Sequence, residues 1–214
     1  MRWEVVKQFK NRVVNSAFEI KKIAVVGGSQ NDPEVAIYLN SSKELKFFGV
    51  DQADNLNFHF LDLNFDSNQE GEFDLVICSQ VLEHIWDVDQ GLKTLSKMTK
   101  PGGLIWINCP FSNVAHGSPD FFSTGYSPKL IVNLLEKYGA EPIFATQIGS
   151  PRSYFFTHTV RFWPTEKIYR RPLTPRISRF YLKKLPLLMI SQFKSAKVTE
   201  SETFATETIV LLKK

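Results

Sequence analysis

Short hydrophobic runs alternate with stretches of helical spacing along this chain, and the clearest example lies between Phe73 and Phe111. Residues 75–78 (LVIC) form an uninterrupted apolar run, as in a strand that is buried on both faces. From residue 81 to 98 apolar side chains return at helical spacing, and residues 101–103 (PGG) then end the predicted helix. A second apolar strand is expected at 104–108. The pattern predicts a strand–helix–strand unit, which builds a parallel sheet with a right-handed crossover.

The same alternation extends over most of the chain and predicts an α/β fold. Further strands are expected at residues 23–26, 45–50, 58–61, 141–147 and 206–212. Helices are expected at residues 1–22, 32–40 and 127–138. Three of the strands are followed directly by Gly27, Asp51 and Asp62. Because ligands of open α/β sheets bind at the carboxyl ends of the strands, we predict a binding site at this edge.

Composition and cysteine content indicate the cellular compartment of the protein. The chain has 214 residues, 43% of them hydrophobic and 22% charged, as in a soluble globular protein with one substantial core. No apolar run reaches the length of a membrane span, and the N-terminal residues MRWEVVKQFK lack the apolar core of a signal peptide. Cys78 and Cys109 both lie at the ends of predicted buried strands, which favours free thiols. We therefore expect a cytoplasmic protein.

The net charge of +4 is unevenly distributed. Residues 151–198 contain eleven Lys and Arg and a single acid, Glu166, so this segment carries +10 and the rest of the chain −6. The segment is also rich in aromatic residues and prolines. Such asymmetry indicates an acidic partner for this segment.

The order of these features resembles the class I S-adenosylmethionine-dependent methyltransferases, in particular the type 11 group. The resemblance rests on FDLVICSQVLEHI, on the helix after it and on KPGGLIWINCP, and with Asp51 and Asp62 it covers roughly residues 23–143. The later stretch HGSPDFFSTGYSPKLIVNLLEKYGAEPI also looks like a subgroup that methylates sugars and cell-surface polysaccharides.

The resemblance implies a Rossmann-like, doubly wound sheet of seven strands in the order 3-2-1-4-5-7-6, with the last strand antiparallel and helices on both faces. The chain would form a single methyltransferase-like domain, residues 1–214. Its additions would be an N-terminal helix (1–22) and the basic aromatic insertion (151–198) before the last strand. In this family such additions often shape the acceptor pocket.

The resemblance also implies a site for S-adenosylmethionine. The turn of Gly27, Gly28 and Ser29 would lie against the methionine part of the cofactor, where glycine lets the backbone approach closely. This turn departs from the family pattern, because Val25 stands where an acid is usual, and Ser29 and Asn31 stand where glycines are usual.

The adenosine part of the cofactor would meet the next two strand ends. Asp51 would bind the ribose hydroxyls with Gln52 beside the adenine, and Asp62 would meet the adenine amino group. The remaining predicted cleft residues are Leu63, Ser79, Gln80 and His84. For the acids the alternatives are a helix cap or a solvated turn, and for His84 a packing role.

Methyl transfer to an oxygen needs a base that removes the acceptor proton. His116, in the loop after residue 110, is the candidate base, and Asp120 is expected to orient it or to bind the acceptor. The alternative for His116 is an exposed loop histidine. The sequence assigns no metal ligands.

Two functions from different classes are compatible with the sequence. The first is a methyltransferase acting on a small molecule, with a hydroxyl of a sugar or cell-surface precursor as the acceptor. The second is a catalytically silent methyltransferase-like domain that binds a ligand or partner through residues 151–198. For that segment itself four roles stay open: a lid over an anionic acceptor, a membrane-facing helix, a homodimer or packing arm, and, ranked below the lid, a nucleic-acid surface.

Overall fold

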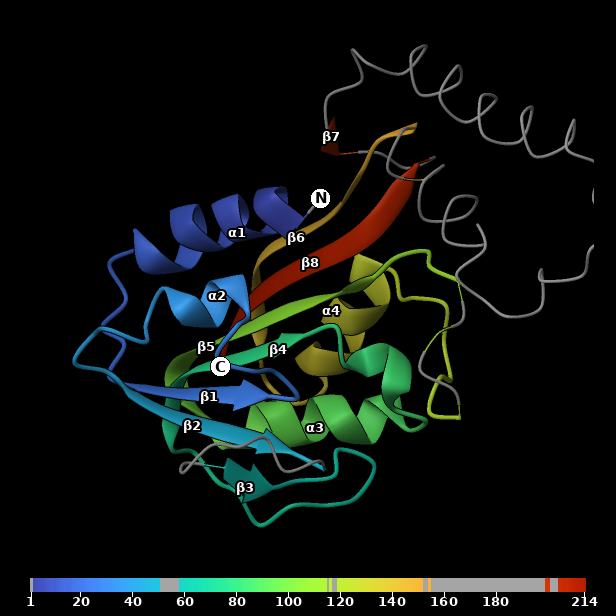
Figure 1. Ribbon diagram of the computed structural model, residues 1–214. Coiled ribbons are helices and arrows are strands. Elements are labelled where there is room, and N and C mark those ends of the chain that lie inside the picture. Colours follow the sequence, from blue (N-terminus) through green and yellow to red (C-terminus); the bar gives the residue numbers. More distant parts are fainter. Residues whose placement is uncertain are drawn as a thin grey trace, which may run out of the picture.

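The computed structural model describes residues 2–50, 58–114, 116, 119–151, 154, 199–200 and 204–214. These residues form one mixed sheet in the order β3-β2-β1-β4-β5-β8-β6-β7, with helices on both faces (Figure 1). The strands are β1 (Lys22–Val26), β2 (Glu44–Gly49), β3 (Phe58–Phe60), β4 (Phe73–Ser79), β5 (Thr99–Pro110), β6 (Glu141–Gly149), β7 (Thr199–Glu200) and β8 (Ala205–Lys213). The helices are α1 (Arg2–Phe9), α2 (Pro33–Ala36), α3 (Val88–Met98) and α4 (Pro128–Glu136).

The strand order confirms the predicted doubly wound arrangement. The neighbouring strands from β3 to β5 pair in parallel, whereas β8 runs antiparallel to both β5 and β6. One addition was not expected: the two-residue strand β7 pairs with the end of β6 and makes the sheet eight-stranded. Reversal of β8 places its apolar residues against β5, whose strand core is buried on both faces.

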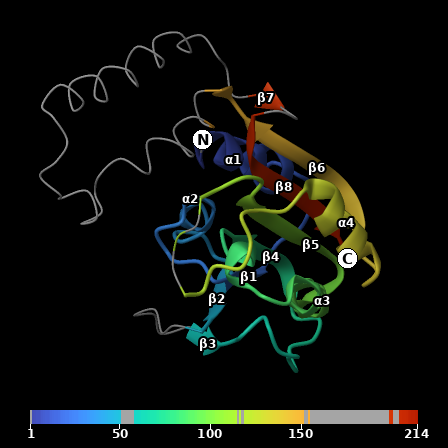
Figure 2. The ribbon, with the colours of Figure 1, turned by 90° about the vertical axis from the view of Figure 1, so that its right-hand side faces the viewer.

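Helices cover the two faces of the sheet separately, as the two views show (Figures 1 and 2). On one face α1 and α2 pack over a cluster built around Trp106 and Phe9, whose ring centroids lie 5.1 Å apart. On the other face α3 and α4 bury Leu92, Leu95 and Leu135 against the sheet. Alternate residues of the central strands enter the two clusters, as the period of a β-strand requires.

Three predicted helices differ from those observed. The N-terminal helix continues past α1 as a wide turn (Lys10–Val14) and stops there, well before residue 22. The helix expected at 32–40 is regular only over α2. The helix expected at 81–98 is divided into a 3₁₀ turn (Leu82–His84) and α3, because Ile85 is extended and Asp87 starts a new helix by accepting from the Gln90 amide at 3.0 Å.

A buried carboxylate fixes the edge of the sheet that lies opposite the strand ends. Asp74, at the start of β4, accepts hydrogen bonds from the backbone amides of Lys21 (2.9 Å) and Lys22 (2.8 Å) and pairs with Lys100. The Phe-Asp pair that helped to suggest the family therefore aligns β1 with β4. Its role is structural, because it lies at the amino ends of the strands.

Several predictions fall on residues outside those described. Asp51, Gln52 and nearly all of the basic segment 151–198 belong to this group, so their predicted roles are not tested here. In the described part of the chain, no helix is both long and apolar enough to cross a membrane. Cys78 and Cys109 are buried and free, as expected.

Candidate active site

A cleft of about 800 Å³ opens at the carboxyl ends of β1, β2 and β4, where the sequence predicted a binding site. The predicted residues that line it are Gly27, Gly28, Ser29, Asp62, Leu63, Gln80, His84 and Asp120. The remaining described predictions, Ser79 and His116, lie outside the lining. The edge of a parallel sheet is the expected place for such a cleft, because backbone groups there are free to meet a ligand.

The glycine turn after β1 forms one wall of the cleft. Gly27 has a φ of +67°, a region that L-residues other than glycine rarely enter, and its amide donates to the Phe48 carbonyl at 2.7 Å. A Cβ at this position would lie 2.5 Å from a Val81 methyl group. Glycine at 27 therefore allows the turn after β1 to lie directly against the turn after β4.

The same turn is closed by a side chain of its own. The Asp32 carboxylate accepts a hydrogen bond from the Ser29 amide at 2.8 Å, and the Asp32 amide donates back to the Ser29 carbonyl at 3.1 Å. Val25, at the position where the family usually has an acid, is buried in the core. The Ser29 amide, a natural donor to a cofactor carboxylate, thus already has an anionic acceptor within the protein.

Gln80, in the turn after β4, has an unusual backbone conformation. Its φ is +59°, the one positive value among the described non-glycine residues. The Gln80 amide donates to the Asn108 carbonyl at 2.7 Å, and the side-chain Nε2 donates to Asn108 Oδ1 (3.0 Å) and Glu207 Oε2 (2.9 Å). Hydrogen bonds to β5 and β8 therefore hold a strained residue at the cleft.

Glu207, on the neighbouring strand β8, completes this network. Its Oε2 also accepts from Asn108 Nδ2 at 3.1 Å. Burial raises the pKa of Glu207 to about 7, although the hydrogen bonds from Asn108 and Gln80 favour its charged form. The network that positions Gln80 thus contains a carboxyl group that titrates near neutral pH.

Polar turns and aromatic side chains form the opposite wall. Asp62 Oδ1 accepts from the amide and the side chain of Asn64 (2.9 and 3.0 Å), and Asn64 Oδ1 accepts from the Trp86 amide at 2.9 Å. Leu63 is buried under this loop, whereas Trp86 and Phe122 are more than half exposed. Asp62 therefore shapes the loop as an Asx turn, and its predicted contact with adenine remains a prediction.

Two histidines and a buried glutamate gather at the Asp120 end of the cleft. His84 lines the cleft, and its ring lies 5.2 Å from the ring of His116, centroid to centroid. His116 Nε2 lies 4.0 Å from Glu83 Oε1. Glu83 is fully buried, and burial raises the pKa of its carboxyl group. Asp120 approaches His84 Nδ1 through its backbone carbonyl, so this contact does not orient His116 as predicted.

Sequence reasoning missed several residues of this site. Glu83 is part of the LEH motif, and its position near the start of the predicted helix 81–98 gave no sign of complete burial. Glu207 is 127 residues away from its partner Gln80, and no local pattern joins them. Only the antiparallel return of β8 brings this carboxylate beneath the cleft.

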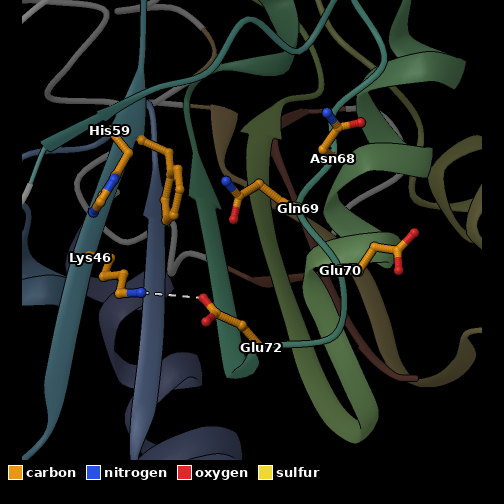
Figure 3. Close-up of a pocket in the computed structure, with 7 residues that line it drawn as sticks. Lys46, His59, Asn68, Gln69, Glu70 and Glu72 are labelled. Carbon is orange, nitrogen blue, oxygen red and sulfur yellow. Dashed lines mark hydrogen bonds and ion pairs between the residues drawn. The ribbon is translucent and has the colours of Figure 1, made fainter.

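A second hollow, of about 420 Å³, lies between β2, β3 and the loop before β4 (Figure 3). Its one lysine, Lys46, pairs with Glu72 at 3.3 Å and lies 3.8 Å from Glu44. His59 stacks on Phe48 with ring centroids 5.2 Å apart. Lys46 is already paired with carboxylates, so the cleft at the strand ends is the stronger candidate.

Comparison with known proteins finds a methyltransferase domain in part of the chain. A methyltransferase-domain family matches residues 32–105, from the acid that closes the glycine turn to the middle of β5. Over these residues the chain matches the methyltransferase family that its sequence resembles. The resemblance found in the sequence is thereby confirmed, together with S-adenosylmethionine as the cofactor of the family.

Curated relatives match over part of their length. The chain is 32% identical over 104 residues to a demethylmenaquinone methyltransferase of Mycolicibacterium gilvum, covering 48% of this chain and 41% of that protein. It is 26% identical over 83 residues to a ubiquinone biosynthesis O-methyltransferase of Coxiella burnetii, covering 39% and 34% of the two chains. The chain thus spans less than half of the length of these relatives.

Solved structures agree with the fold over the whole chain. A methyltransferase from Archaeoglobus fulgidus superposes with a TM-score of 0.58 at 12% identity, covering 100% of this chain and 95% of the other. A phosphoethanolamine N-methyltransferase from Haemonchus contortus, solved with S-adenosylmethionine, gives 0.57 at 13% identity, covering 99% and 52%. At these identities the agreement concerns the fold alone.

Proposed function

We propose that this protein transfers a methyl group from S-adenosylmethionine to a small-molecule acceptor. The observation that carries the proposal is the cleft between the glycine turn and Gln80, at the carboxyl edge of a methyltransferase sheet. Methyl transfer from a sulfonium is an in-line displacement, in which the acceptor atom attacks the methyl carbon and the thioether leaves with the electron pair. Alignment of the three atoms supplies much of the rate. A cleft held by two fixed turns suits this requirement.

The acceptor end of the cleft is the end that contains Trp86, Phe122 and Asp120. Exposed aromatic rings beside polar groups suit a cyclic or partly apolar small molecule. The quinone-pathway names of the two curated relatives agree with a small-molecule acceptor. Within this class we retain a hydroxyl of a sugar or cell-surface precursor as the proposed acceptor.

His116 is the proposed acceptor of the proton that a hydroxyl loses when it is methylated. It lies behind His84, so the proton would reach it through that histidine or a bridging water. Asp120, at the rim of the cleft, is proposed to bind the acceptor. Replacement of His116 by alanine is expected to lower turnover at least tenfold without loss of cofactor binding, by the usual contribution of a general base.

The second candidate function is a silent methyltransferase-like domain that binds a ligand or partner. The observation in its favour is the Ser29 amide, which Asp32 already engages at 2.8 Å. An anion placed so close to the expected position of the cofactor carboxylate disfavours binding of the methionine part.

Titration calorimetry with S-adenosylmethionine and S-adenosylhomocysteine separates the two functions. The proposed enzyme binds both, with dissociation constants below the millimolar range. A Gly27→Ala variant, whose Cβ would close the turn against Val81, should bind neither ligand, and a thermal melt checks that it is folded. Absence of binding at millimolar cofactor would reject the enzyme and favour the silent domain. Radioactive methyl transfer to quinol, catechol and sugar acceptors then identifies the acceptor class.

The cellular context belongs to the same proposal. We propose a cytoplasmic enzyme in which the basic segment 151–198 covers an anionic acceptor. Contact of that segment with a membrane surface, and a homodimer, are the other proposed arrangements. Deletion of the segment, followed by comparison of KM for charged and neutral acceptors, distinguishes the lid from the others.

A further inference from the structure

Three side chains at the Asp120 end of the cleft bring metal-ligating atoms close together. One ligand atom each from Glu83, His84 and His116 can be chosen so that all three lie within 4.8 Å of one another. Among the residues that the structure describes, no other group of three or more His, Cys, Asp or Glu converges in this way. Two of the three residues come from the turn after β4, and the third comes from the loop after β5.

The spacing of these atoms argues against direct hydrogen bonds. His116 Nε2 and Glu83 Oε1 are 4.0 Å apart, beyond the roughly 3.2 Å of an N–H···O hydrogen bond. Ligands bound to one zinc ion at about 2.0–2.2 Å are separated from each other by about 3 to 4.3 Å, depending on the angle between them. The observed gap is too wide for a hydrogen bond and close to that of two ligands on one ion.

The histidine rings are also oriented as metal ligands usually are. His116 Nδ1 lies 3.0 Å from the Val114 carbonyl, and His84 Nδ1 lies against the Asp120 carbonyl. Because a carbonyl oxygen only accepts, each of these contacts requires the proton on Nδ1, and in the neutral imidazole Nε2 then carries the lone pair. A backbone carbonyl that fixes the tautomer in this way is a common outer partner of a ligating histidine.

Glu83 supplies an independent observation. Its side chain is fully buried, and neither carboxylate oxygen has a hydrogen-bond partner in the described part of the structure. A buried carboxyl group without a partner is strongly disfavoured, and a bound cation is one of the few ways to compensate it. The carboxylate lies toward His116, with Oε1 4.0 Å from the ring Nε2.

We propose that Glu83, His84 and His116 form a binding site for a divalent transition-metal cation. Two imidazoles and one carboxylate suit zinc, manganese or ferrous iron better than calcium or magnesium, which prefer oxygen ligands. His84 lines the cleft, so a cation held by these residues would be accessible from the cleft. The site does not depend on the proposed methyl transfer.

If the protein does methylate a hydroxyl, this inference changes the role of His116. A cation at this position lowers the pKa of a hydroxyl that binds to it. His116 would then be a ligand, and the proton would leave to solvent or to a group at the rim. Replacement of His116 lowers turnover in either role, whereas a chelator lowers turnover only if the metal takes part.

The test uses the full chain treated with EDTA and then dialysed free of it. Calorimetry with zinc chloride should give one site per chain, and cobalt substitution should give visible absorption bands of a site with two imidazoles. His116→Ala and Glu83→Gln should each weaken zinc binding at least tenfold. His59→Ala is the matched control, because His59 is an exposed histidine outside this cluster, and it should bind zinc as the unchanged protein does.

A thermal melt shows whether each variant is folded. Zinc should raise the melting temperature of the unchanged protein and of His59→Ala, and should leave that of His116→Ala unchanged, because a ligand stabilises only a state that binds it. Equal zinc binding by His116→Ala and the unchanged protein would overturn the proposal, as would absence of binding at millimolar zinc. Cofactor binding measured with and without EDTA separates this result from failure of the proposed function, since the metal ligands lie outside the glycine turn.

Discussion

The turns after β1 and β4 leave neighbouring parallel strands at the same edge of the sheet, yet different forces hold them. The turn after β1 is closed from within the local sequence, by Asp32 on the Ser29 amide. The turn after β4 is held from a distance, by Asn108 and Glu207 on Gln80. The first depends on residues three positions apart, and the second on residues 28 and 127 positions apart.

The two turns nevertheless form one unit, because Gly27 lies directly against Val81. A disturbance in either turn should therefore reach the other. The comparison suggests that the turn after β4 is fixed by the fold and can tolerate little change. The turn after β1 is held by its own residues, so a change in one of their side chains can alter its conformation locally. The following four experiments, taken from the largest expected effect to the smallest, test this difference.

Replacement of Gly27 by alanine should destabilise the protein most. The new Cβ would lie 2.5 Å from Val81 Cγ2, and the backbone would keep a φ of +67°. Overpacking and left-handed strain together are expected to cost about 2–4 kcal/mol of the free energy of unfolding. Urea denaturation measures the loss. The double variant with Val81→Ala should recover the part due to the clash; no recovery would mean that the two turns are independent.

The Glu207 network should make stability depend on pH. The pKa of Glu207 is about 7 in the folded protein and near 4.5 when unfolded. The folded state therefore keeps a proton that the unfolded state releases, and this contribution to stability is full below pH 4.5 and is lost as pH rises to about 7. At one pKa unit per 1.36 kcal/mol, and allowing for partial exposure, the loss is about 2 kcal/mol.

Glu207→Gln provides the control for this pH effect. Glutamine keeps an oxygen that accepts from Gln80 and Asn108 and does not titrate, so the decline between pH 4.5 and 7 should be absent. At pH 8 the variant should be more stable than the unchanged protein. If the free energy of unfolding falls equally for both proteins between pH 4.5 and 7, another group causes the decline.

A pair of substitutions at Gln80 isolates the strain in the turn after β4. Alanine and glycine both remove the side-chain hydrogen bonds to Asn108 and Glu207. Glycine also relieves the backbone at a φ of +59°, so Gln80→Gly should be more stable than Gln80→Ala by about 1 kcal/mol. Chemical denaturation of the two variants under identical conditions measures the difference. Equal stabilities would show that the conformation carries no strain.

Asp32→Asn should have the smallest effect on stability and should act on ligand affinity instead. Asparagine keeps an oxygen that accepts from the Ser29 amide, and stability is expected to change by less than about 1 kcal/mol. Removal of a negative charge beside the cleft should strengthen binding of the S-adenosylmethionine carboxylate several-fold. Calorimetry in low and high salt checks this, because an electrostatic gain diminishes as salt is added. Weaker binding by the variant would mean that Asp32 supports the cofactor.

Local patterns in the sequence were sufficient to predict most of the sheet. Apolar runs located seven of the eight strands, and the order of strands, turns and motifs gave the family and the strand order. Gly27 also located the cleft from the sequence, because a glycine turn after a strand can be recognised from the local residues alone. The strand β7 was missed, since two residues that pair with β6 are too few to form a recognisable hydrophobic pattern. The split between residues 82–84 and α3 was missed because both parts face the same core.

The sequence by itself thus determined which residues form strands, which edge of the sheet carries the cleft, and which family the chain resembles. All of these depend on interactions between near neighbours or on the period of a strand. Only the tertiary structure decided that Glu207 lies beneath Gln80, that Val81 lies against Gly27, and that Glu83 is buried facing two histidines. Each of these contacts joins residues from separate strand ends. Their environment, and hence their charge and chemistry, exists only once the sheet has assembled.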